Sequence, residues 1–316
     1  MNIMISDYQT PERMAQKLQA VPLPDLHEKT LLDVGCDGRA WCELATSLGA
    51  SRVVGIDRGR LQHDGSWLDL ADHTMDLGRQ YHDLGQFDVV LCLSMYHHAY
   101  QSAGGDHRPI WYWLWRQTKP GGMVLWEGPL ENSDPVVKKD VASEYHQHYN
   151  ESALLIAAAR RFWVQFIGPA LHTETRSVYR MSQSKLPVKL INGQTQTGTG
   201  GATKAFDYDH GRRVDEIETI LGIRCLPGSL NVQCNADFWW DEDYYRAEVS
   251  DVIDRRAGLD SEWGPRWARF YPVTVNGLQA WAFRFEGEKY SNRFVELISC
   301  HRLRDSIDGA VTIVGG

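Results

Sequence analysis

The sequence predicts two domains, a doubly wound α/β domain with a parallel sheet and a mostly β domain after it. In the first half, short apolar runs alternate with segments of helical spacing, which is typical of a sheet covered by helices on both faces. The apolar run "KTLLDVG" and the following segment "RAWCELATSLGA" are the first such pair. Further along, short runs separated by turn residues, such as "LQAWAFRFEG" and "GAVTIVG", predict the strands of a barrel or sandwich.

The expected elements follow the chain in order. In the first domain we expect strands at residues 29–35, 51–57, 87–94 and 123–128, and helices at residues 39–50, 108–118 and 152–163. "KPGG" predicts a turn before the fourth strand, and "FWVQFIG" and "RSVYRM" predict an antiparallel pair that closes the domain. "SQSKLPVKL" marks the boundary, which gives a domain of residues 1–184 and a domain of residues 185–316 with one helix near residues 213–221.

Composition narrows the classes of function. Hydrophobic residues make up 43% and charged residues 23% of the chain, which is typical of a globular protein. No apolar run has the ~18 residues of a membrane span, and the beginning of the sequence lacks a basic and apolar leader, so we expect a cytoplasmic protein. The six cysteines form no CxxC pair, which indicates buried thiols, and the net charge of −8 does not favour nucleic acid as a partner.

The first candidate site lies where "LLDVGCDGRA" joins a strand to a helix. Ligands of open α/β sheets bind at the carboxyl ends of strands, where a glycine such as Gly35 lets the backbone approach them. Asp57 ends the second strand and offers a carboxylate to both hydroxyls of a ribose, although it could also be a turn residue. A dinucleotide fold would need G-x-G-x-x-G, and only Gly35 and Gly38 are present, which argues against a pyrophosphate cradle.

On these residues the first half resembles the class I S-adenosylmethionine-dependent methyltransferases. "LDVGCDGRA", "VVGID", "FDVVLCLSMYHHA" and "KPGGMVLWEG" occur in that family's order, and the resemblance covers about residues 1–182. It implies a Rossmann-like fold with S-adenosylmethionine as cofactor. The implied cofactor-binding residues are Asp33, Gly35 and Asp37 at the methionine moiety, Asp57 at the ribose, and Ser94 and Met95. Of the family's three glycines only the first is kept, since Asp37 and Arg39 occupy the other two positions.

The same resemblance places Tyr96, His97 and His98 on the substrate side, as candidate catalytic residues. A histidine suits acid–base work near neutral pH. The pair could equally begin a helix and have no chemical role. A second pair, His146 and His148, is separated by two positions, which points the side chains apart on a helix, so we expect no metal there.

The second candidate site combines "TGTGGA" with "PGSLN". Consecutive glycines let backbone amides converge on phosphate oxygens, although the GK[ST] of a Walker loop is missing. In an extended segment, Ser229 and Asn231 point to the same face, where two neutral oxygens can hold Mg²⁺ with phosphate oxygens and water. Each motif alone could be only a turn, but the two together predict a phosphate site.

With "RFVELISCHRLRDSIDGAVTIV", these motifs resemble the CTP-dependent riboflavin kinases of archaea, a cradle-loop barrel family, over about residues 190–316. The resemblance implies that Ser229 and Asn231 bind Mg²⁺ and that Glu296 holds the acceptor hydroxyl, unless Glu296 is only a surface strand position. The implied nucleotide-binding residues are Gly198, Thr199, Gly200, Gly201, Ala202, Thr203, His301, Arg302, Leu303 and Arg304. A longer aromatic and acidic segment at residues 233–268 departs from the family, so riboflavin is not implied as the acceptor.

Together the two resemblances imply a bifunctional enzyme. The first domain would transfer a methyl group from S-adenosylmethionine, and the second would phosphorylate a hydroxyl of a sugar, a glycan end or another polyol with CTP and Mg²⁺. The product of the kinase could be the substrate of the methyltransferase, with the phosphate itself as one acceptor. Two alternatives stay open: the barrel could be a non-catalytic binding module, or the first domain could only sense its cofactor.

Overall fold

The computed structural model describes residues 11–58, 70–171, 175–183, 189–196, 212–241, 244–253, 262–288, 290–307 and 309–315. The chain forms two compact units. The first consists of Met1–Gly78 and Leu84–Lys185, and the second of Arg79–Asp83 and Leu186–Gly316. No helix in the described ranges is both long enough and apolar enough to cross a membrane.

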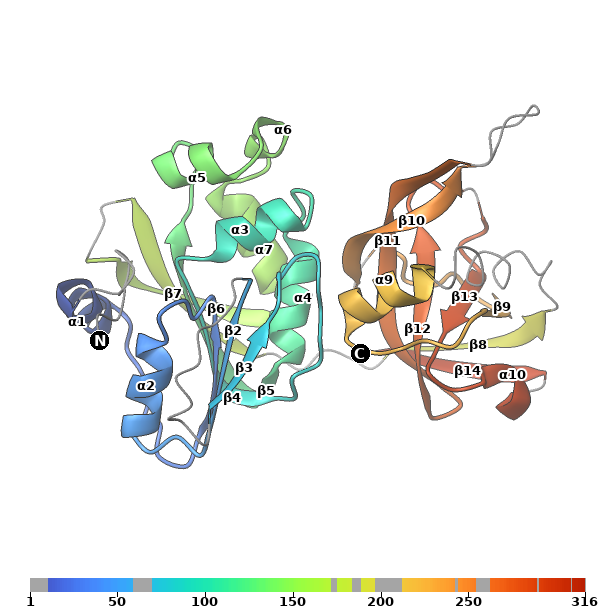
Figure 1. Ribbon diagram of the computed structural model, residues 1–316, viewed down its shortest axis with the longest axis horizontal. Helices are drawn as coiled ribbons and strands as arrows, with labels where there is room; N and C mark the ends of the chain where they lie inside the picture. The colour runs from blue at the N-terminus through green and yellow to red at the C-terminus, as the bar shows by residue number, and fades with distance from the viewer. Residues whose placement is uncertain are drawn as a thin grey trace. The chain divides into compact units, whose positions relative to one another are not determined.

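The first unit is built on one seven-stranded sheet, ordered β3-β2-β1-β4-β5-β7-β6 (Figure 1). Its strands are β1 (Thr30–Val34), β2 (Arg52–Asp57), β3 (Leu70–Thr74), β4 (Phe87–Leu93), β5 (Thr118–Pro129), β6 (Phe162–Pro169) and β7 (Arg176–Gln183). Its helices are α1 (Pro11–Ala20), α2 (Ala40–Ser47), α3 (Tyr96–Ser102), α4 (Arg108–Arg116), α5 (Pro135–Asp140), α6 (Ser143–His146) and α7 (Glu151–Ala159). The first five strands pair in parallel, and β6 and β7 complete the sheet as an antiparallel pair. The doubly wound α/β class predicted from the sequence is confirmed.

Helices cover both faces of this sheet, which explains why its central strands β1 and β4 are mostly apolar. Figure 1 shows α1 and α2 on one face and α4 and α7 on the other. On the first face, Trp41 and Cys42 of α2 pack in one core with Leu31 of β1. On the other face, Trp111 and Trp113 of α4 are fully buried. The tryptophans of "WYWLWR" therefore include core residues, as their large apolar area favours.

The structure differs from the expected elements at several places, since the sequence did not predict the short helices α5 and α6. Strand β3 and helix α1 were not predicted, since β3 has the sequence "LADHT", with neither an apolar run nor regular alternation. Strand β5 begins at Thr118 and includes "KPGG", where a turn was expected. The sequence signal was still real, because the pairing of β4 with β5 shifts register between Phe87 and Val89, and Gly121 has a φ of 82°.

The second unit is a closed antiparallel barrel. Its strands are β8 (Lys189–Gln196), β9 (Leu230–Cys234), β10 (Tyr245–Ile253), β11 (Glu262–Val275), β12 (Leu278–Phe285), β13 (Phe294–Ile298) and β14 (Ala310–Gly315). Its helices are α9 (Arg212–Leu221) and α10 (Leu303–Ser306). The order is β10-β11-β12-β13-β9-β8-β14, and β11 also pairs with β14, which closes six strands into a ring. The predicted barrel class and the helix near residues 213–221 are confirmed, whereas the short helix α10 was not predicted.

The barrel is filled by alternate side chains of its strands. Val232 of β9, Leu297 of β13 and Ile313 of β14 are all fully buried in one apolar core. The aromatic and acidic segment at residues 233–268 contains all of β10, which pairs with β11 alone and so lies outside the closed ring. Glu286 binds the guanidinium groups of Arg246 and Arg269 from these two strands. The segment thus extends one wall of the barrel.

Candidate functional site

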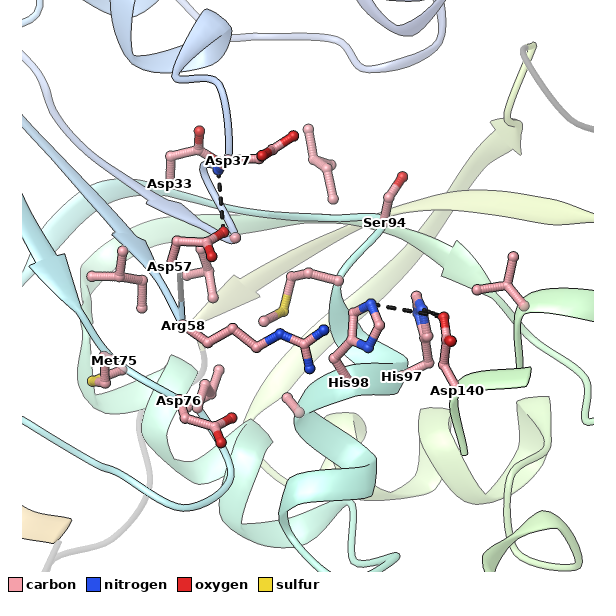
Figure 2. Close-up of a pocket in the computed structure, with 18 of the residues that line it drawn as sticks. Asp33, Asp37, Asp57, Arg58, Met75, Asp76, Ser94, His97, His98 and Asp140 are labelled. Atoms are coloured by element: carbon pink, nitrogen blue, oxygen red, sulfur yellow. Dashed lines mark hydrogen bonds and ion pairs between the residues drawn. The ribbon is translucent and has the colours of Figure 1, made fainter. Parts of the chain in front are cut away.

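The first unit contains a cavity of about 460 Å³ at the carboxyl ends of β1, β2 and β4. This is the edge at which ligands of open α/β sheets bind. Figure 2 shows Asp33, Asp37 and Asp57 at one side of the cavity and His97, His98 and Asp140 at the other. The sequence predicted Asp33, Gly35, Asp37, Asp57, Ser94, Met95, His97 and His98 for this site, and all of them line the cavity.

The turn after β1 brings backbone close to the cavity because Gly35 has no side chain. Gly35 has a φ of 79°, and a Cβ atom there would lie 2.7 Å from Cβ of Met95. Its N–H donates to the carbonyl of Ile56, which ties the turn to β2. Asp37 and Arg39 also have positive φ values, 37° and 66°. The positions where the family's glycines are missing therefore keep the left-handed backbone that glycine adopts most easily.

Two carboxylates follow β2 and β3 at the same edge of the sheet. Asp57 ends β2 and accepts a hydrogen bond from the backbone N–H of Asp37, at 3.2 Å from its Oδ2. Asp76 follows β3 and accepts one from the hydroxyl of Ser102 at 2.8 Å. The two acceptors lie on the wall of the cavity, so a ligand with hydroxyl and amino groups would find acceptors there.

Asp33 and Lys17 are two buried ionisable groups that line the cavity. Burial raises the pKa of the Asp33 carboxyl to about 7, and the hydrogen bond from the Cys42 thiol opposes this shift. Burial likewise lowers the pKa of Lys17, although Glu127 works in the other direction. Both side chains are at most 5% exposed. The cavity thus has an acidic group that changes charge close to neutral pH.

Lys17 belongs to a chain of hydrogen bonds that reaches across the sheet. Its ammonium donates to the hydroxyl of Ser94 at 3.2 Å, and that hydroxyl donates to Oε2 of Glu127. The other carboxylate oxygen of Glu127 lies 3.5 Å from the guanidinium of Arg176 on β7. Ser94 itself has a φ of 63° at the end of β4. These contacts fix the polar wall of the cavity before any ligand binds.

His97 and His98 lie in the first turn of α3 and face Asp140 at the end of α5 (Figure 2). The Nε2 atoms of His97 and His98 lie 3.5 Å and 3.9 Å from Oδ2 of Asp140. Burial lowers the pKa of His97 to about 2, and it also lowers the pKa of His98. Both imidazoles are therefore neutral at pH 7, with a lone pair available on one ring nitrogen.

Tyr96, the third candidate catalytic residue, lies elsewhere. Its hydroxyl is bonded to Nδ1 of His107 at 2.9 Å, and its ring packs against Trp111 and Trp126. The side chain is fully buried and is not part of the cavity wall. Tyr96 thus supports α3 from the core, because helical geometry points it away from the face that carries His97 and His98.

In the second unit, the predicted metal and acceptor residues come together. Ser229 precedes β9 and its hydroxyl lies 3.4 Å from Oδ1 of Asn231 and 3.4 Å from Oε1 of Glu296. Asn231 and Glu296 are directly paired in the ladder of β9 and β13. Three side-chain oxygens thus converge at this end of β9 and β13. Oxygens of this kind suit Mg²⁺.

A second cavity, of about 410 Å³, opens beside Ser229. The predicted residues His301, Arg302, Leu303 and Arg304 line it. The guanidinium of Arg304 donates to the carbonyl of Ser229 at 3.1 Å, so α10 is tied to the start of β9. The predicted glycine loop, residues 198–203, lies outside the described residues.

Several residues of the first cavity were missed by the sequence analysis. Those that line it include Lys17, Arg58, Asp76, Asp140 and Arg176. Glu127 was missed as well, and it accepts the hydrogen bond of Ser94 from the cavity wall. Glu127 could have been found, because a carboxylate that ends the apolar run "MVLWEG" is a buried charge and needs a partner. Asp140 gave no such signal, since "PVVKKD" reads as a solvated helical turn.

The family profiles agree with this division of the chain. The profile described as Methyltransferase domain matches residues 6–161. The profile CTP-dep_RFKase, described as Domain of unknown function DUF120, matches residues 201–310. The chain therefore carries a methyltransferase domain, and after it a domain of the CTP-dependent riboflavin kinase type.

Similar curated proteins exist for each half. The Ubiquinone biosynthesis O-methyltransferase of Neisseria meningitidis serogroup C (strain 053442) is 29% identical over 155 residues, which are 46% of this chain and 60% of that protein. The chain thus spans less than two thirds of this relative. The Riboflavin kinase of Methanopyrus kandleri (strain AV19) is 29% identical over 116 residues, which are 37% of this chain and 73% of that protein.

Two solved structures resemble the first unit at low identity. An S-adenosylmethionine-dependent methyltransferase from Mesorhizobium loti is 17% identical, with a TM-score of 0.42, over 54% of this chain and 97% of that one. The N-methyltransferase NodS from Bradyrhizobium japonicum WM9, in complex with S-adenosyl-L-homocysteine, is 14% identical, with a TM-score of 0.36, over 54% of this chain and 84% of that one.

Proposed function

We propose that the first unit transfers a methyl group from S-adenosylmethionine to an oxygen of a small acceptor. The observation that supports this most is the cavity at the carboxyl ends of β1, β2 and β4, with the close approach at Gly35 and the carboxylates of Asp33 and Asp57 around it. The O-methyltransferase name of the curated relative supports oxygen as the acceptor atom.

The residues present fit this cofactor. Asp33 offers a carboxylate for the ammonium of its methionine moiety, and Asp57 offers one for the ribose hydroxyls. When bound, S-adenosylmethionine supplies a methyl group on a positively charged sulfur. The acceptor oxygen forms the new bond to this carbon as the carbon–sulfur bond breaks and its electrons stay on sulfur. His97, His98 and Asp140 position the acceptor, whose proton passes to solvent on the side where Asp140 is exposed.

Binding and turnover test this function separately. Calorimetry with the purified full chain should give one binding site for S-adenosylmethionine and one for S-adenosylhomocysteine. Substitution of Asp57 by Ala should weaken binding by about 10-fold or more, since hydrogen bonds that a charged group makes contribute ~1.5–3 kcal/mol. Absence of binding by the unchanged protein would refute the proposal, and binding without methyl transfer to any hydroxyl compound would favour a cofactor sensor.

We also propose that the second unit transfers a phosphoryl group from CTP, with Mg²⁺, to a hydroxyl. The convergence of Ser229, Asn231 and Glu296 beside the second cavity supports this. Ser229 and Asn231 would hold the metal, and Glu296 would hold the acceptor hydroxyl. Phosphoryl transfer requires mainly positioning and neutralisation of charge, and Arg304 adds a cation at this site.

Product formation tests the kinase against a non-catalytic barrel. With CTP, Mg²⁺ and a panel of sugars and polyols, the protein should release CDP. Replacement of Asn231 by Ala should lower the rate by about 10–100-fold, the range expected when support for a metal is lost. Ser291→Ala is the matched control, because this serine is exposed and its hydroxyl accepts a hydrogen bond from the backbone of Arg293. Nucleotide binding without CDP release would favour the binding module.

The fusion of the two domains suggests that both act on one substrate. The phosphorylated sugar, glycan end or polyol would then be the methyl acceptor. If methyl transfer requires prior incubation with CTP and Mg²⁺, the two reactions are consecutive. Equal methylation without the nucleotide would separate them.

A further inference from the structure

His97, His98 and Asp140 form a cluster at the acceptor end of the first cavity, and the imidazole of His97 has no hydrogen-bond partner within the described part of the protein. His97 is 1% exposed, yet neither Nδ1 nor Nε2 has a hydrogen-bond partner. Buried polar groups in folded proteins are nearly always paired, so an orphaned imidazole facing a cavity indicates a ligand. One ligand atom each of His97, His98 and Asp140 lies within 4.8 Å of the others, the one such group among the described residues.

The distances within this cluster decide between a hydrogen-bonded pair and a metal site. A hydrogen bond between imidazole and carboxylate would need about 2.7–3.2 Å between the heavy atoms. The observed separations from Oδ2 of Asp140 are 3.5 Å to Nε2 of His97 and 3.9 Å to Nε2 of His98. Ligands about 2.0–2.2 Å from a tetrahedral ion lie ~3.4 Å from one another. Two of the three separations are therefore close to those of ligands around an ion, and the third, between the two imidazoles, is at most 4.8 Å.

We propose that His97, His98 and Asp140 bind a divalent transition-metal ion, such as Zn²⁺ or Mn²⁺, which holds the oxygen of the methyl acceptor. Two imidazoles and one carboxylate with open positions are a donor set that suits these metals. The role toward the acceptor rests on the proposed function, whereas the metal site itself does not.

The surroundings of the cluster tolerate a cation. The described wall of the cavity carries five carboxylates (Asp33, Asp37, Asp57, Asp76 and Asp140) and four basic side chains (Lys17, Arg58, Lys139 and Arg176). The cavity therefore has no excess of positive charge. Figure 2 shows Arg58 and His98 between Asp57 and Asp140. The open side of the ion would face this space.

Such an ion has a definite use in methyl transfer. A hydroxyl on a divalent ion has a lowered pKa, so it loses its proton more easily near neutral pH. The proton goes to solvent past Asp140, and the oxygen keeps the electron pair that forms the bond to the methyl carbon. The other product is the neutral thioether. The site therefore predicts an acceptor with an acidic or chelating hydroxyl.

Metal content and spectroscopy test the site without reference to activity. The full chain, freed of metal with a chelator, is titrated with Zn²⁺, Mn²⁺ and Co²⁺, and bound metal is measured by mass spectrometry and by the visible spectrum of Co²⁺. We expect one ion per chain beyond any ion of the second unit. Asp140→Asn and His97→Gln should each weaken binding by about 100-fold or more, because even loss of a supporting group costs 10–100-fold.

Two controls keep the test decisive. His148→Gln changes an exposed histidine of the same unit and should bind metal as the unchanged protein does. Asp140 is partly exposed, so Asp140→Asn should fold, which its affinity for S-adenosylmethionine checks. Equal metal binding by Asp140→Asn and the unchanged protein would overturn the site, and so would no binding by either. Failure to bind S-adenosylmethionine with metal still bound would refute the proposed function alone.

Discussion

The two cavities of this chain are assembled in different ways. In the first unit, Lys17, Ser94, Glu127 and Arg176 form a buried chain of contacts that holds the polar wall in place. In the second unit, Ser229 has contacts of 3.4 Å to both Asn231 and Glu296, at the long end of hydrogen bonding. The first site is thus preorganised by its own charges, whereas the oxygens of the second site are joined only by these longer contacts.

This difference predicts that the two sites depend differently on Mg²⁺ for ligand binding. A preorganised wall loses little freedom when a cofactor binds, so the first site should bind S-adenosylmethionine without Mg²⁺. The second site should need Mg²⁺ to bind nucleotide tightly.

Gly35→Val should abolish binding of S-adenosylmethionine, with a loss of about 100-fold or more. The added Cβ would lie 2.7 Å from Cβ of Met95, and the φ of 79° strains any side chain. Calorimetry of both ligands measures the effect, since nucleotide binding by the second unit should not change.

The matched control is Gly121→Ala in the same unit. Gly121 has a φ of 82°, but a Cβ atom there would meet nothing within 4 Å. Strain of the left-handed backbone alone should cost about 1–2 kcal/mol of stability and leave the affinity unchanged. If Gly35→Val still bound the cofactor, the close approach at Gly35 would have no part in binding.

The affinity for S-adenosylmethionine should depend on pH through Asp33. The cofactor's ammonium binds the ionised carboxylate, whose pKa is about 7. The ionised fraction, and with it the affinity, should fall about tenfold from pH 8 to pH 6. Calorimetry at both values measures this change, and Asp33→Asn should be weak and nearly independent of pH. A wild-type affinity that is equal at both pH values would place the ammonium elsewhere.

The same group makes an opposite prediction for the unliganded protein. Burial raises the pKa of Asp33 from the ordinary value of 3.8 to about 7, so the folded state binds this proton more tightly than the unfolded chain. Its contribution to stability is present below pH 4 and is lost as pH rises to 7. Asp33→Asn should therefore raise the thermal midpoint at pH 8, when measured without ligand. A rise in pH through 7 should therefore increase the affinity for S-adenosylmethionine and decrease the stability of the unliganded protein.

The smallest effect is expected for Asp37→Gly. Asp37 already has a φ of 37°, and it is its backbone N–H that reaches Asp57. Glycine adopts this backbone easily but loses more freedom on folding, so the stability should change by less than about 1 kcal/mol. The affinity for S-adenosylmethionine should stay within threefold. A larger loss would show that the carboxylate of Asp37, and not its backbone, contacts the cofactor.

The sequence predicted the parts of the fold that local signals encode. Buried strands such as "FDVVLCL" are apolar at nearly every position, and Gly49 follows the end of its helix as expected, with a φ of 84°. Strand β3 was not predicted because its sequence has neither an apolar run nor regular alternation. Its place in the sheet comes from pairing with β2. The prediction of a turn at "KPGG" was wrong because these residues belong to β5, whose pairing with β4 shifts register at this point.

The candidate sites divide in the same way. Residues that end strands or lie in motifs, such as Asp57 and Ser229, could be proposed from the sequence. Lys17, Arg176 and Asp140 could not, because their importance comes from partners far away in the chain. His97 was proposed as catalytic, but only the structure brings Asp140 to it.

The closure of the barrel sets the order in which this chain can fold. Strand β8 pairs with β14, and the hydroxyl of Thr312 donates to the side chain of Asn192 across 120 positions of sequence. Contacts at such separations form slowly, because a long loop must close first. On the ribosome, the first unit can fold as soon as β7 has emerged, whereas the second keeps unpaired strand edges until residues 310–315 are made. During that interval β8 and β11 are the edges that a chaperone would have to protect.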